Sequence, residues 1–292
     1  MGRGEAQHTK DLINAMHEVL EVGDDAIAPA SVRAVYYQMI GRKGTDGSPL
    51  ITPTKRGYKK VSRALTIGRD DGRISWDSII DQQRRRRYAP TWKDPKDYAE
   101  SIATYRRDFW QFQPYTVEVW SEKSTVEGLL WPTLKRYGVD FLALKGWSST
   151  TSVHEAAEFT AHLRYHLRVL YIGDWDPSGM YMSEKDLPRR LKKYRGKVSL
   201  TRIALRREDL RVLPQAFETE EKEQDTRREW YEETYGLDCW EVDAINPNRL
   251  RERVSNAIER LIVNKAAWAR AATIEQAEQE SIRTILERIN GL

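Results

Sequence analysis

Three acidic residues follow strand-like segments and have the chemistry of metal ligands. Asp174 and Asp176 come directly after the apolar run 169–172, and Glu122 comes after the strand-like segment 116–120. Side chains alternate along an extended chain, so the two aspartates should point the same way. Carboxylate oxygens are the hard ligands that Mg²⁺ or Mn²⁺ prefers. We therefore predict that Glu122, Asp174 and Asp176 hold a divalent cation.

Other interpretations of these acidic residues stay open. Asp176 precedes a proline, a residue favoured in the first turn of a helix, so the Asp-x-Asp sequence also fits a helix-capping turn. Glu118 lies in the same segment as Glu122 and is an alternative first ligand. His162 and His166 are four residues apart, but the single cysteine and the lack of a third suitably spaced histidine argue against a zinc site.

A tyrosine and an arginine in the N-terminal third form a candidate nucleophilic pair. In a helix over 32–40, the apolar spacing buries Tyr36 and places Tyr37 on the other side, one turn after Arg33. A neighbouring cation favours the deprotonated, nucleophilic form of a phenol. Tyr37 is therefore a candidate nucleophile, although a surface tyrosine stacked on an arginine is the plainer interpretation.

The first 90 residues have the pattern of a DNA-binding domain. We predict helices over 8–22 and 32–40, the second capped by Ser31, then a third helix from residue 54 and a short strand or wing at 72–76. Three short helices followed by a β element are typical of a winged helix-turn-helix. Basic residues on or beside the third helix and after the wing are candidate DNA phosphate contacts. They are Lys55, Arg56, Lys59, Lys60, Arg63, Arg69, Arg73, Arg84 and Arg85, the last two within a run of four arginines.

The remainder of the chain has the pattern of a parallel α/β domain. We expect a linking helix within 91–113, placed at 94–112, and a second domain over 114–292. Its predicted strands are 116–120, 141–144, 169–172, 199–205 and 239–245, and its predicted helices are 124–137, 151–167, 177–194, 249–263 and 266–289. The carboxyl ends of parallel strands meet at one edge of a sheet, so Glu122 should lie beside Asp174 and Asp176.

Composition indicates an intracellular protein with a polyanionic partner. The 292 residues include 40% hydrophobic residues and one cysteine, Cys239, which excludes a disulfide framework and fits a reducing cytoplasm. We see no apolar run of membrane length and no signal peptide. The net charge is only +4, but residues 31–90 carry 14 Lys and Arg against 5 Asp and Glu, a balance of +9. Residues 216–243 carry 3 basic and 11 acidic residues, a balance of −8. This asymmetry favours nucleic acid as the partner of the N-terminal third.

Two sets of motifs together resemble a known family. Glu122-Lys123 after the first strand and Asp174-x-Asp176-Pro-x-Gly after a later one resemble the Toprim domain of topoisomerases, primases and some nucleases. The sequences Arg33-x-x-aromatic-Tyr37 and 240–247, Trp-Glu-Val-Asp-Ala-Ile-Asn-Pro, make the closer resemblance one to the A-type subunit of topoisomerase VI and to the meiotic double-strand-break transesterase. The chain is most similar to the compact stand-alone, or mini-A, type. The resemblance implies a winged-helix (CAP-like) domain followed by a Toprim domain with C-terminal helices.

This resemblance also implies an activity. Tyr37 would attack a phosphodiester of double-stranded DNA and form a 5′-phosphotyrosyl bond, with Arg33 and Lys123 assisting and the three acidic residues holding Mg²⁺ or Mn²⁺. In the family the tyrosine of one subunit meets the metal of the other, which implies a homodimer that cuts both strands. A separate ATPase B-type subunit is a further implied partner, because this chain has no GxxxxGK nucleotide loop. The expected location is the prokaryotic nucleoid, or a bacterial host of a phage or mobile element.

Two other function classes fit the same residues. A hydrolytic Toprim nuclease would use the acidic residues to activate water, and Tyr37 would then be structural. A non-catalytic winged-helix protein would only bind DNA through its basic residues.

Overall fold

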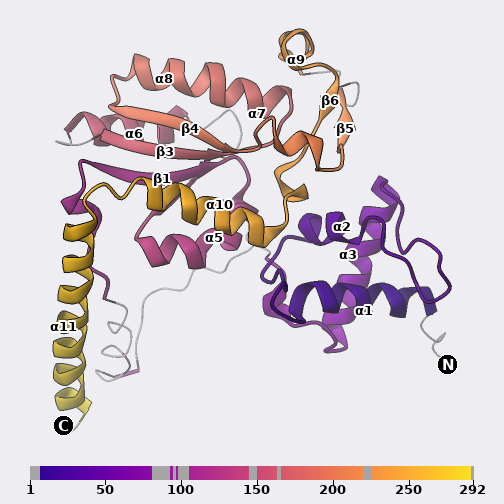
Figure 1. Ribbon diagram of the computed structural model, residues 1–292, viewed down its shortest axis with the longest axis horizontal. Helices are drawn as coiled ribbons and strands as arrows, with labels where there is room; N and C mark the ends of the chain where they lie inside the picture. The colour runs from indigo at the N-terminus through magenta and orange to yellow at the C-terminus, as the bar shows by residue number, and fades with distance from the viewer. Residues whose placement is uncertain are drawn as a thin grey trace.

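The computed structural model describes residues 7–80, 93–94, 97, 105–144, 150–162, 166–219 and 225–290. Figure 1 shows two groups of elements, a cluster of three helices near the N-terminus and a sheet with helices on both faces. The sheet is parallel and belongs to the predicted α/β class. A long helix leads away from the sheet to the C-terminus.

The three N-terminal helices form as the apolar spacing predicts. They are α1 (Gln7–Glu21), α2 (Val32–Met39) and α3 (Lys55–Asp70), and their buried residues make a separate core that includes Leu12, Val35 and Leu65. The side chain of Ser31 caps α2 by accepting a hydrogen bond from the Ala34 amide across 3.0 Å, as expected from its position.

The strand predicted at 72–76 is wrong. Gly72 adopts a left-handed conformation with φ +76°, and the amide of Ile74 donates to the carbonyl of Gly68 across 2.9 Å. This segment therefore turns back onto α3 and buries Ile74, so its backbone is not available to a β ladder. Trp76–Ser78 then forms a 3₁₀ turn, and Ile79 makes an isolated parallel bridge with Ala30. The winged-helix assignment stays a prediction, since the following residues, Arg84 and Arg85 among them, lie outside the described ranges.

The sheet contains four parallel strands in the order β2-β1-β3-β4. Their bounds are β1 (Tyr115–Ser121), β2 (Asp140–Ala143), β3 (His166–Ile172) and β4 (Val198–Ala204). Ser121, the last residue of β1, pairs in register with Ile172, the last residue of β3. The residues that follow these two strands therefore begin at the same edge of the sheet, as the sequence analysis predicts.

Helices cover both faces of the sheet (Figure 1). On one face, α5 (Ser124–Tyr137) and α10 (Pro247–Arg260) pack on side chains that include Val119 and Leu170. The other face carries α6 (Thr150–His162) and α8 (Leu187–Lys193), and Trp120 and Tyr171 are buried there. The short helix α7 (Pro177–Tyr181) precedes α8 and buries Met180 in the core that includes Val119 and Leu170. A π-helical turn joins α7 to α8, which the sequence pattern predicts as one helix. Burial of β3 from both faces explains its apolar run at 169–172.

Several predicted boundaries differ from the structure. α6 ends at His162 and β3 begins at His166, so these two histidines do not share a helix. The strand predicted at 239–245 is replaced by β6 (Asp238–Cys239), which pairs antiparallel with β5 (Phe217–Glu218), and by a 3₁₀ turn at Val242–Ala244. Residues 105–109 are not helical and Trp110–Phe112 forms a 3₁₀ turn, so this part of the predicted linking helix is wrong, and most of the remainder lies outside the described residues.

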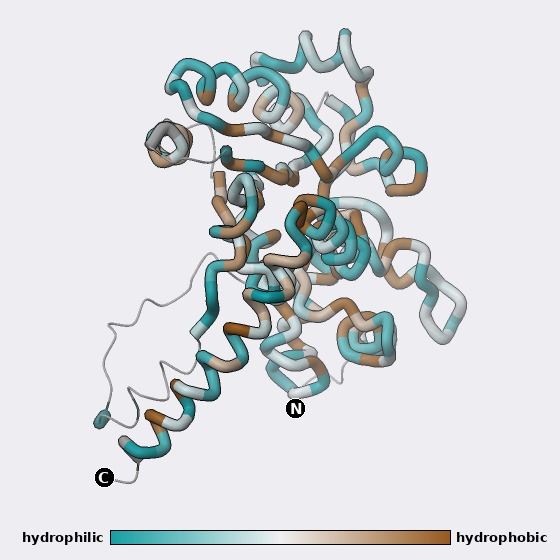
Figure 2. Tube along the Cα trace, turned by 60° about the vertical axis from the view of Figure 1, so that its left-hand side comes forward, coloured by the Kyte–Doolittle hydropathy of each residue, from teal (hydrophilic) through white to brown (hydrophobic). Residues whose placement is uncertain are grey.

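The C-terminal helix is long and amphipathic. α11 (Lys265–Asn290) packs Trp268 edge-on against the rings of Phe109 and Trp110. Farther along, Glu278 accepts hydrogen bonds from the Tyr105 hydroxyl and the Arg107 guanidinium. Figure 2 shows hydrophobic and hydrophilic residues alternating along this helix toward the C-terminus. In the described part of the chain, every helix is too short or too polar to cross a membrane. A further helix, α9 (Arg228–Tyr235), lies between β5 and β6 in the sequence.

Candidate active site

A backbone pairing between two tryptophans assembles the site. Trp175, in the loop after β3, and Trp240, after β6, form an antiparallel bridge in which each amide donates to the other's carbonyl across 2.9 Å. This bridge brings residues 241–243 next to the loop that carries Asp174 and Asp176. The amide of Val242 donates to Oδ1 of Asp174 across 2.7 Å, which closes the contact.

The loop after β3 ends in a helix cap. Asp176 is buried, and its Oδ1 accepts the amide of Gly179 across 2.7 Å at the start of α7, where Pro177 is the first helical residue. A Cβ atom at position 179 would lie 2.4 Å from the carbonyl oxygen of Asp174, so only glycine fits this close approach. The helix-capping interpretation of Asp176 is therefore confirmed.

Lys123 connects the acidic residues of both loops. Its Nζ lies 3.1 Å from Oδ1 of Asp174 and 2.6 Å from Oδ2 of Asp243. Burial alone would lower the pKa of Lys123, but the charges of Asp174, Asp243 and Glu241 raise it above its usual value. A salt bridge from Lys123 to Glu122, the plainer role of this lysine, is not among its described contacts.

The two aspartates around Lys123 differ in their electrostatics. Burial, reinforced by the charge of Asp176, raises the pKa of Asp174 to about 7 despite the opposing effect of Lys123. Burial also acts to raise the pKa of Asp243, but the charge and hydrogen bond of Lys123, with a hydrogen bond from Ser31, lower it overall. The Ser31 hydroxyl donates to Oδ1 of Asp243 across 2.6 Å. Ser31 thus both caps α2 and binds an acidic residue of the sheet domain.

Glu241 accepts hydrogen bonds from the two predicted catalytic residues of α2. Nη1 of Arg33 lies 2.6 Å from Oε1 and 2.5 Å from Oε2 of Glu241, and the Tyr37 hydroxyl donates to Oε2 across 3.2 Å. The guanidinium of Arg33 also lies over the ring of Tyr58, with its central carbon 5.0 Å from the ring centroid. Tyr36 is buried in the helical core, as predicted, and Tyr37 is half-buried.

The phenol of Tyr37 is held in its protonated form. Burial and then the charge and hydrogen bond of Glu241 raise the pKa of Tyr37, and the opposing charges of Arg33 and Lys123 are weaker. The charge of Arg33 acts toward the deprotonated form, as expected, but it does not determine the net pKa shift of Tyr37. The physical reason is the burial of the phenol, together with Glu241, which pairs with Arg33 and adds a negative charge beside the hydroxyl.

Glu122 lies at the predicted edge of the sheet, but its carboxylate binds a tyrosine of β3. Its Oε1 accepts a hydrogen bond from the Tyr171 hydroxyl across 2.5 Å. Glu118 pairs in register with Val169 in the middle of β3 and accepts Trp120 Nε1 across 2.6 Å, so it lies away from the strand ends. Within the described ranges, no three acidic, histidine or cysteine side chains converge closely enough to hold an ion as they stand.

A cleft of about 870 Å³ opens between the helical cluster and the sheet domain. Arg33 and Tyr58 line it from the helices, and Glu122, Lys123 and Asp243 line it from the other side. The described residues that line the cleft do not include Tyr37, Asp174 or Asp176. Glu241, which does line it, accepts the hydrogen bond of the Tyr37 hydroxyl. The cleft can therefore hold a ligand next to Arg33 and Lys123, which are cations with the chemistry to bind phosphate.

The predicted DNA contacts that lie within the described ranges fall into two groups. On α3, Lys55, Arg56, Lys59 and Arg63 are exposed. Others are engaged within the chain: Lys60 contacts His8 and the Leu50 carbonyl, Arg73 pairs with Asp71, and Arg69 lies over the Trp76 ring and lines the cleft. The structure therefore leaves a basic, exposed first half of α3.

Sequence reasoning missed Glu241 and Asp243 as site residues. Their Glu-x-Asp spacing, shortly before the proline that starts α10, repeats the acid-x-acid pattern that drew attention to Asp174 and Asp176. That repetition is the signal that could have found them. No protein-family model, curated protein or solved structure matches this chain.

Proposed function

We propose that this protein is a metal-dependent tyrosine transesterase that cleaves DNA and resembles the A-type subunit of topoisomerase VI. Its two parts would be a winged-helix domain and a Toprim domain, with Tyr37 as the nucleophile. The observation that carries the proposal is the contact of Tyr37 and Arg33 with Glu241, beside Lys123 and the acidic residues after β3. These two cations and the carboxylates of Glu122, Glu241 and Asp243 thereby line one cleft, and the Tyr37 hydroxyl adjoins it through Glu241.

The chemistry is an exchange of phosphodiester bonds. The Tyr37 oxygen attacks a backbone phosphorus while its proton passes to Glu241, the carboxylate that already accepts that hydrogen bond. The 3′ oxygen of the neighbouring nucleotide leaves and takes up a proton, so that the products are a 5′-phosphotyrosyl link and a free 3′ hydroxyl. Arg33 and Lys123 stabilise the negative charge on the phosphoryl oxygens. One ester bond replaces another, so attack by the 3′ hydroxyl can reseal the strand.

The chemistry of the acidic residues fits a divalent cation. Glu122, Asp174 and Asp176 supply hard carboxylate oxygens at the ends of neighbouring parallel strands, and we propose that they hold Mg²⁺ or Mn²⁺. As they stand, Glu122 contacts Tyr171 and Asp176 caps α7, so binding would require these side chains to turn toward one another. A bound ion would neutralise charge on the phosphate.

DNA binding and assembly complete the proposal. The exposed Lys55, Arg56, Lys59 and Arg63 supply cations for the phosphates of double-stranded DNA. A homodimer would place two such sites on opposite strands, and a separate ATPase B-type subunit would supply ATP-dependent steps. The site of action would be DNA in a prokaryotic nucleoid or in the bacterial host of a phage or mobile element.

A cleavage assay on supercoiled DNA with Mg²⁺ or Mn²⁺, stopped with denaturant, tests the nucleophile. We expect protein attached to 5′ DNA ends with the wild type and with Tyr36→Phe, and none with Tyr37→Phe. Tyr36→Phe is a matched control because it removes a hydroxyl from the adjacent residue of α2. Asp174→Ala should abolish cleavage because it removes a ligand of the ion.

Two outcomes would assign another function. Free DNA ends that persist with Tyr37→Phe would identify a hydrolytic nuclease in which the acidic residues activate water. Salt-sensitive DNA binding without any cleavage by the wild type would leave a DNA-binding protein without catalysis, or one that requires its partner.

A further inference from the structure

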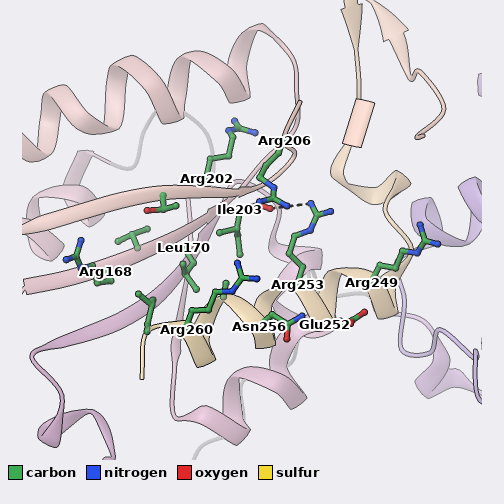
Figure 3. Close-up of a pocket in the computed structure, with 14 residues that line it drawn as sticks. Arg168, Leu170, Arg202, Ile203, Arg206, Arg249, Glu252, Arg253, Asn256 and Arg260 are labelled. Carbon is green, nitrogen blue, oxygen red and sulfur yellow. Dashed lines mark hydrogen bonds between the residues drawn. The ribbon is translucent and has the colours of Figure 1, made fainter. Parts of the chain in front are cut away.

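A second cavity lies on the α10 face of the sheet, apart from the active-site cleft. It has a volume of about 580 Å³ and is half-open, and β3, β4 and α10 form its walls. Leu170 and Ile203, which Figure 3 labels, line it together with Ala257. The residues that line this cavity and those that line the active-site cleft do not overlap in the described part of the chain. We call it the arginine cavity, because arginine is its commonest lining residue.

The lining of the arginine cavity is strongly basic. It contains six arginines and one acidic residue, Glu252. Two of the arginines have carboxylate partners: Arg253 binds both oxygens of Asp209, at 2.6 and 2.7 Å, and Arg206 lies 2.9 Å from Glu208. The guanidinium of Arg202 lies on the other face of the sheet, where it donates to Ser183 Oγ and to the carbonyl of Gly179. The five remaining arginines and the three anions, Glu208, Asp209 and Glu252, leave a balance of +2.

Four lining arginines form no ion pair within the described ranges: Arg168, Arg202, Arg249 and Arg260. Arg202 donates to backbone carbonyls that include that of Gly179, Arg249 is exposed, and Nε of Arg168 is buried without a hydrogen-bond partner. Arg168 lies on β3, in the same face as Leu170, with its guanidinium over the ring of Tyr115. Figure 3 shows Arg253 and Arg260 rising from α10 toward the sheet, whereas Arg202 extends from β4 to the other side. The unpaired positive charge of Arg168 and Arg260 therefore lies in the same cavity as the apolar side chains of Leu170, Ile203 and Ala257.

This arrangement is unfavourable without an anion. Like charges repel one another, and a buried guanidinium nitrogen without an acceptor loses its hydrogen bond to water. A guanidinium is the side chain best matched to phosphate, because its fork of N–H groups binds two oxygens at once. The apolar surface supplies a complementary contact for a flat, weakly polar ring. Ligand pockets have volumes on the order of 300–1,000 Å³, a range that includes this cavity.

We propose that the arginine cavity binds a free phosphate ester of nucleotide size. Its phosphate would contact Arg168 and Arg260, and its ring would lie on Leu170, Ile203 and Ala257. A compact, half-open cavity of this size fits a single nucleotide better than a duplex, which requires an extended surface. The proposal goes beyond the DNA-cleaving function and does not depend on it.

Calorimetric titration of the full chain with ADP, and separately with inorganic phosphate, tests the proposal. We expect one ADP per chain and a weaker affinity for phosphate, by at least about tenfold, because phosphate lacks the ring. Arg260→Ala and Arg168→Gln should each weaken ADP binding roughly tenfold, and Arg260→Lys should have an intermediate effect because lysine keeps the charge without the fork. Arg260 is exposed, so its removal should leave the fold intact.

Matched controls separate this site from the active site. Arg283→Ala removes an exposed arginine of α11 and should leave ADP binding unchanged. Tyr37→Phe should also leave it unchanged, so the two proposals can fail independently. Absence of ADP binding by the wild type, or unchanged affinity in both Arg260→Ala and Arg168→Gln with melting curves like the wild type, would overturn the proposal. Loss of duplex DNA affinity in these variants without any ADP binding would also overturn it, and would make the cavity part of a DNA surface.

Discussion

The Tyr37 hydroxyl donates a hydrogen bond to Oε2 of Glu241 across 3.2 Å, although the two residues lie 204 positions apart. The same carboxylate binds Arg33, one helical turn before Tyr37. A single acidic residue of the sheet domain therefore orients both candidate catalytic side chains of α2. Burial and this carboxylate raise the pKa of Tyr37, so the resting phenol keeps its proton. In the proposed transesterase reaction, Tyr37 would depend on Glu241 as its proton acceptor.

Glu241→Gln should separate the ionisation of Tyr37 from its activity. Loss of the negative charge should lower the pKa of Tyr37, because Arg33 and Lys123 stay beside it. DNA cleavage should nevertheless fall by about 10²-fold or more, since an amide cannot take up the phenolic proton. Absorbance titration of tyrosinate measures the first effect, and the denaturant-stopped cleavage assay measures the second.

Two controls make the Glu241→Gln result specific. The shifted tyrosinate signal should disappear in the double variant with Tyr37→Phe, which assigns it among the 14 tyrosines. Glu229→Gln, an exposed change in α9, should leave cleavage unchanged. Full cleavage by Glu241→Gln would show that another group accepts the proton.

Arg251 joins the two halves of the molecule, and its loss should weaken that junction. Its guanidinium donates to the carbonyls of Ile27 and Pro29, at 3.1 and 2.8 Å, and to the carbonyl of Leu129 at 3.1 Å. Arg251→Ala leaves these acceptors without their charged donor, which should lower the free energy of unfolding by about 3 kcal/mol. Urea unfolding followed by circular dichroism measures this difference.

The control for Arg251→Ala is Arg249→Ala, two residues earlier on α10 and exposed. It should change the free energy of unfolding by less than about 0.5 kcal/mol. Equal effects of the two substitutions would show that the contacts of Arg251 do not stabilise the junction.

Stability should depend on pH through Asp209. Burial acts to raise the pKa of Asp209, but hydrogen bonds from Arg253 and from the Arg206 amide lower it overall. The folded state therefore binds the proton more weakly than the unfolded chain. The stabilisation is present above the unfolded pKa of about 4, and it is lost as the pH falls through the lower folded value. Asp209→Asn should destabilise the protein at pH 7 and have less effect at pH 3, as urea unfolding at both values can show.

The control for Asp209→Asn is Asp24→Asn, a substitution in the exposed turn after α1. It should produce little difference between the two pH values. A loss of stability in Asp209→Asn that is as large at pH 3 as at pH 7 would contradict ionisation of Asp209 as the cause.

Local patterns were sufficient for most elements of the fold. An apolar run marks β3, apolar residues at alternate positions mark β1, and Gly138 ends α5 with φ +60°, as its position after the apolar pattern predicts. Errors occur where the backbone bonds to a distant or unexpected partner. Ile74 returns to Gly68 of α3, so its segment does not form the predicted strand. Residues 242–244 form a 3₁₀ helix that packs beside α2. Their apolar residues account for the strand predicted at 239–245.

The sequence by itself determined that Glu122, Asp174 and Asp176 follow neighbouring strands, because parallel strands share one edge for their carboxyl ends. Only the tertiary structure decided that Glu241 and Asp243 complete the site and that Asp176 is used as a helix cap. The Trp175–Trp240 bridge creates this arrangement. Its two hydrogen bonds join backbone amide and carbonyl groups, which every residue other than proline has. The amino-acid sequence near either tryptophan therefore does not indicate this pairing.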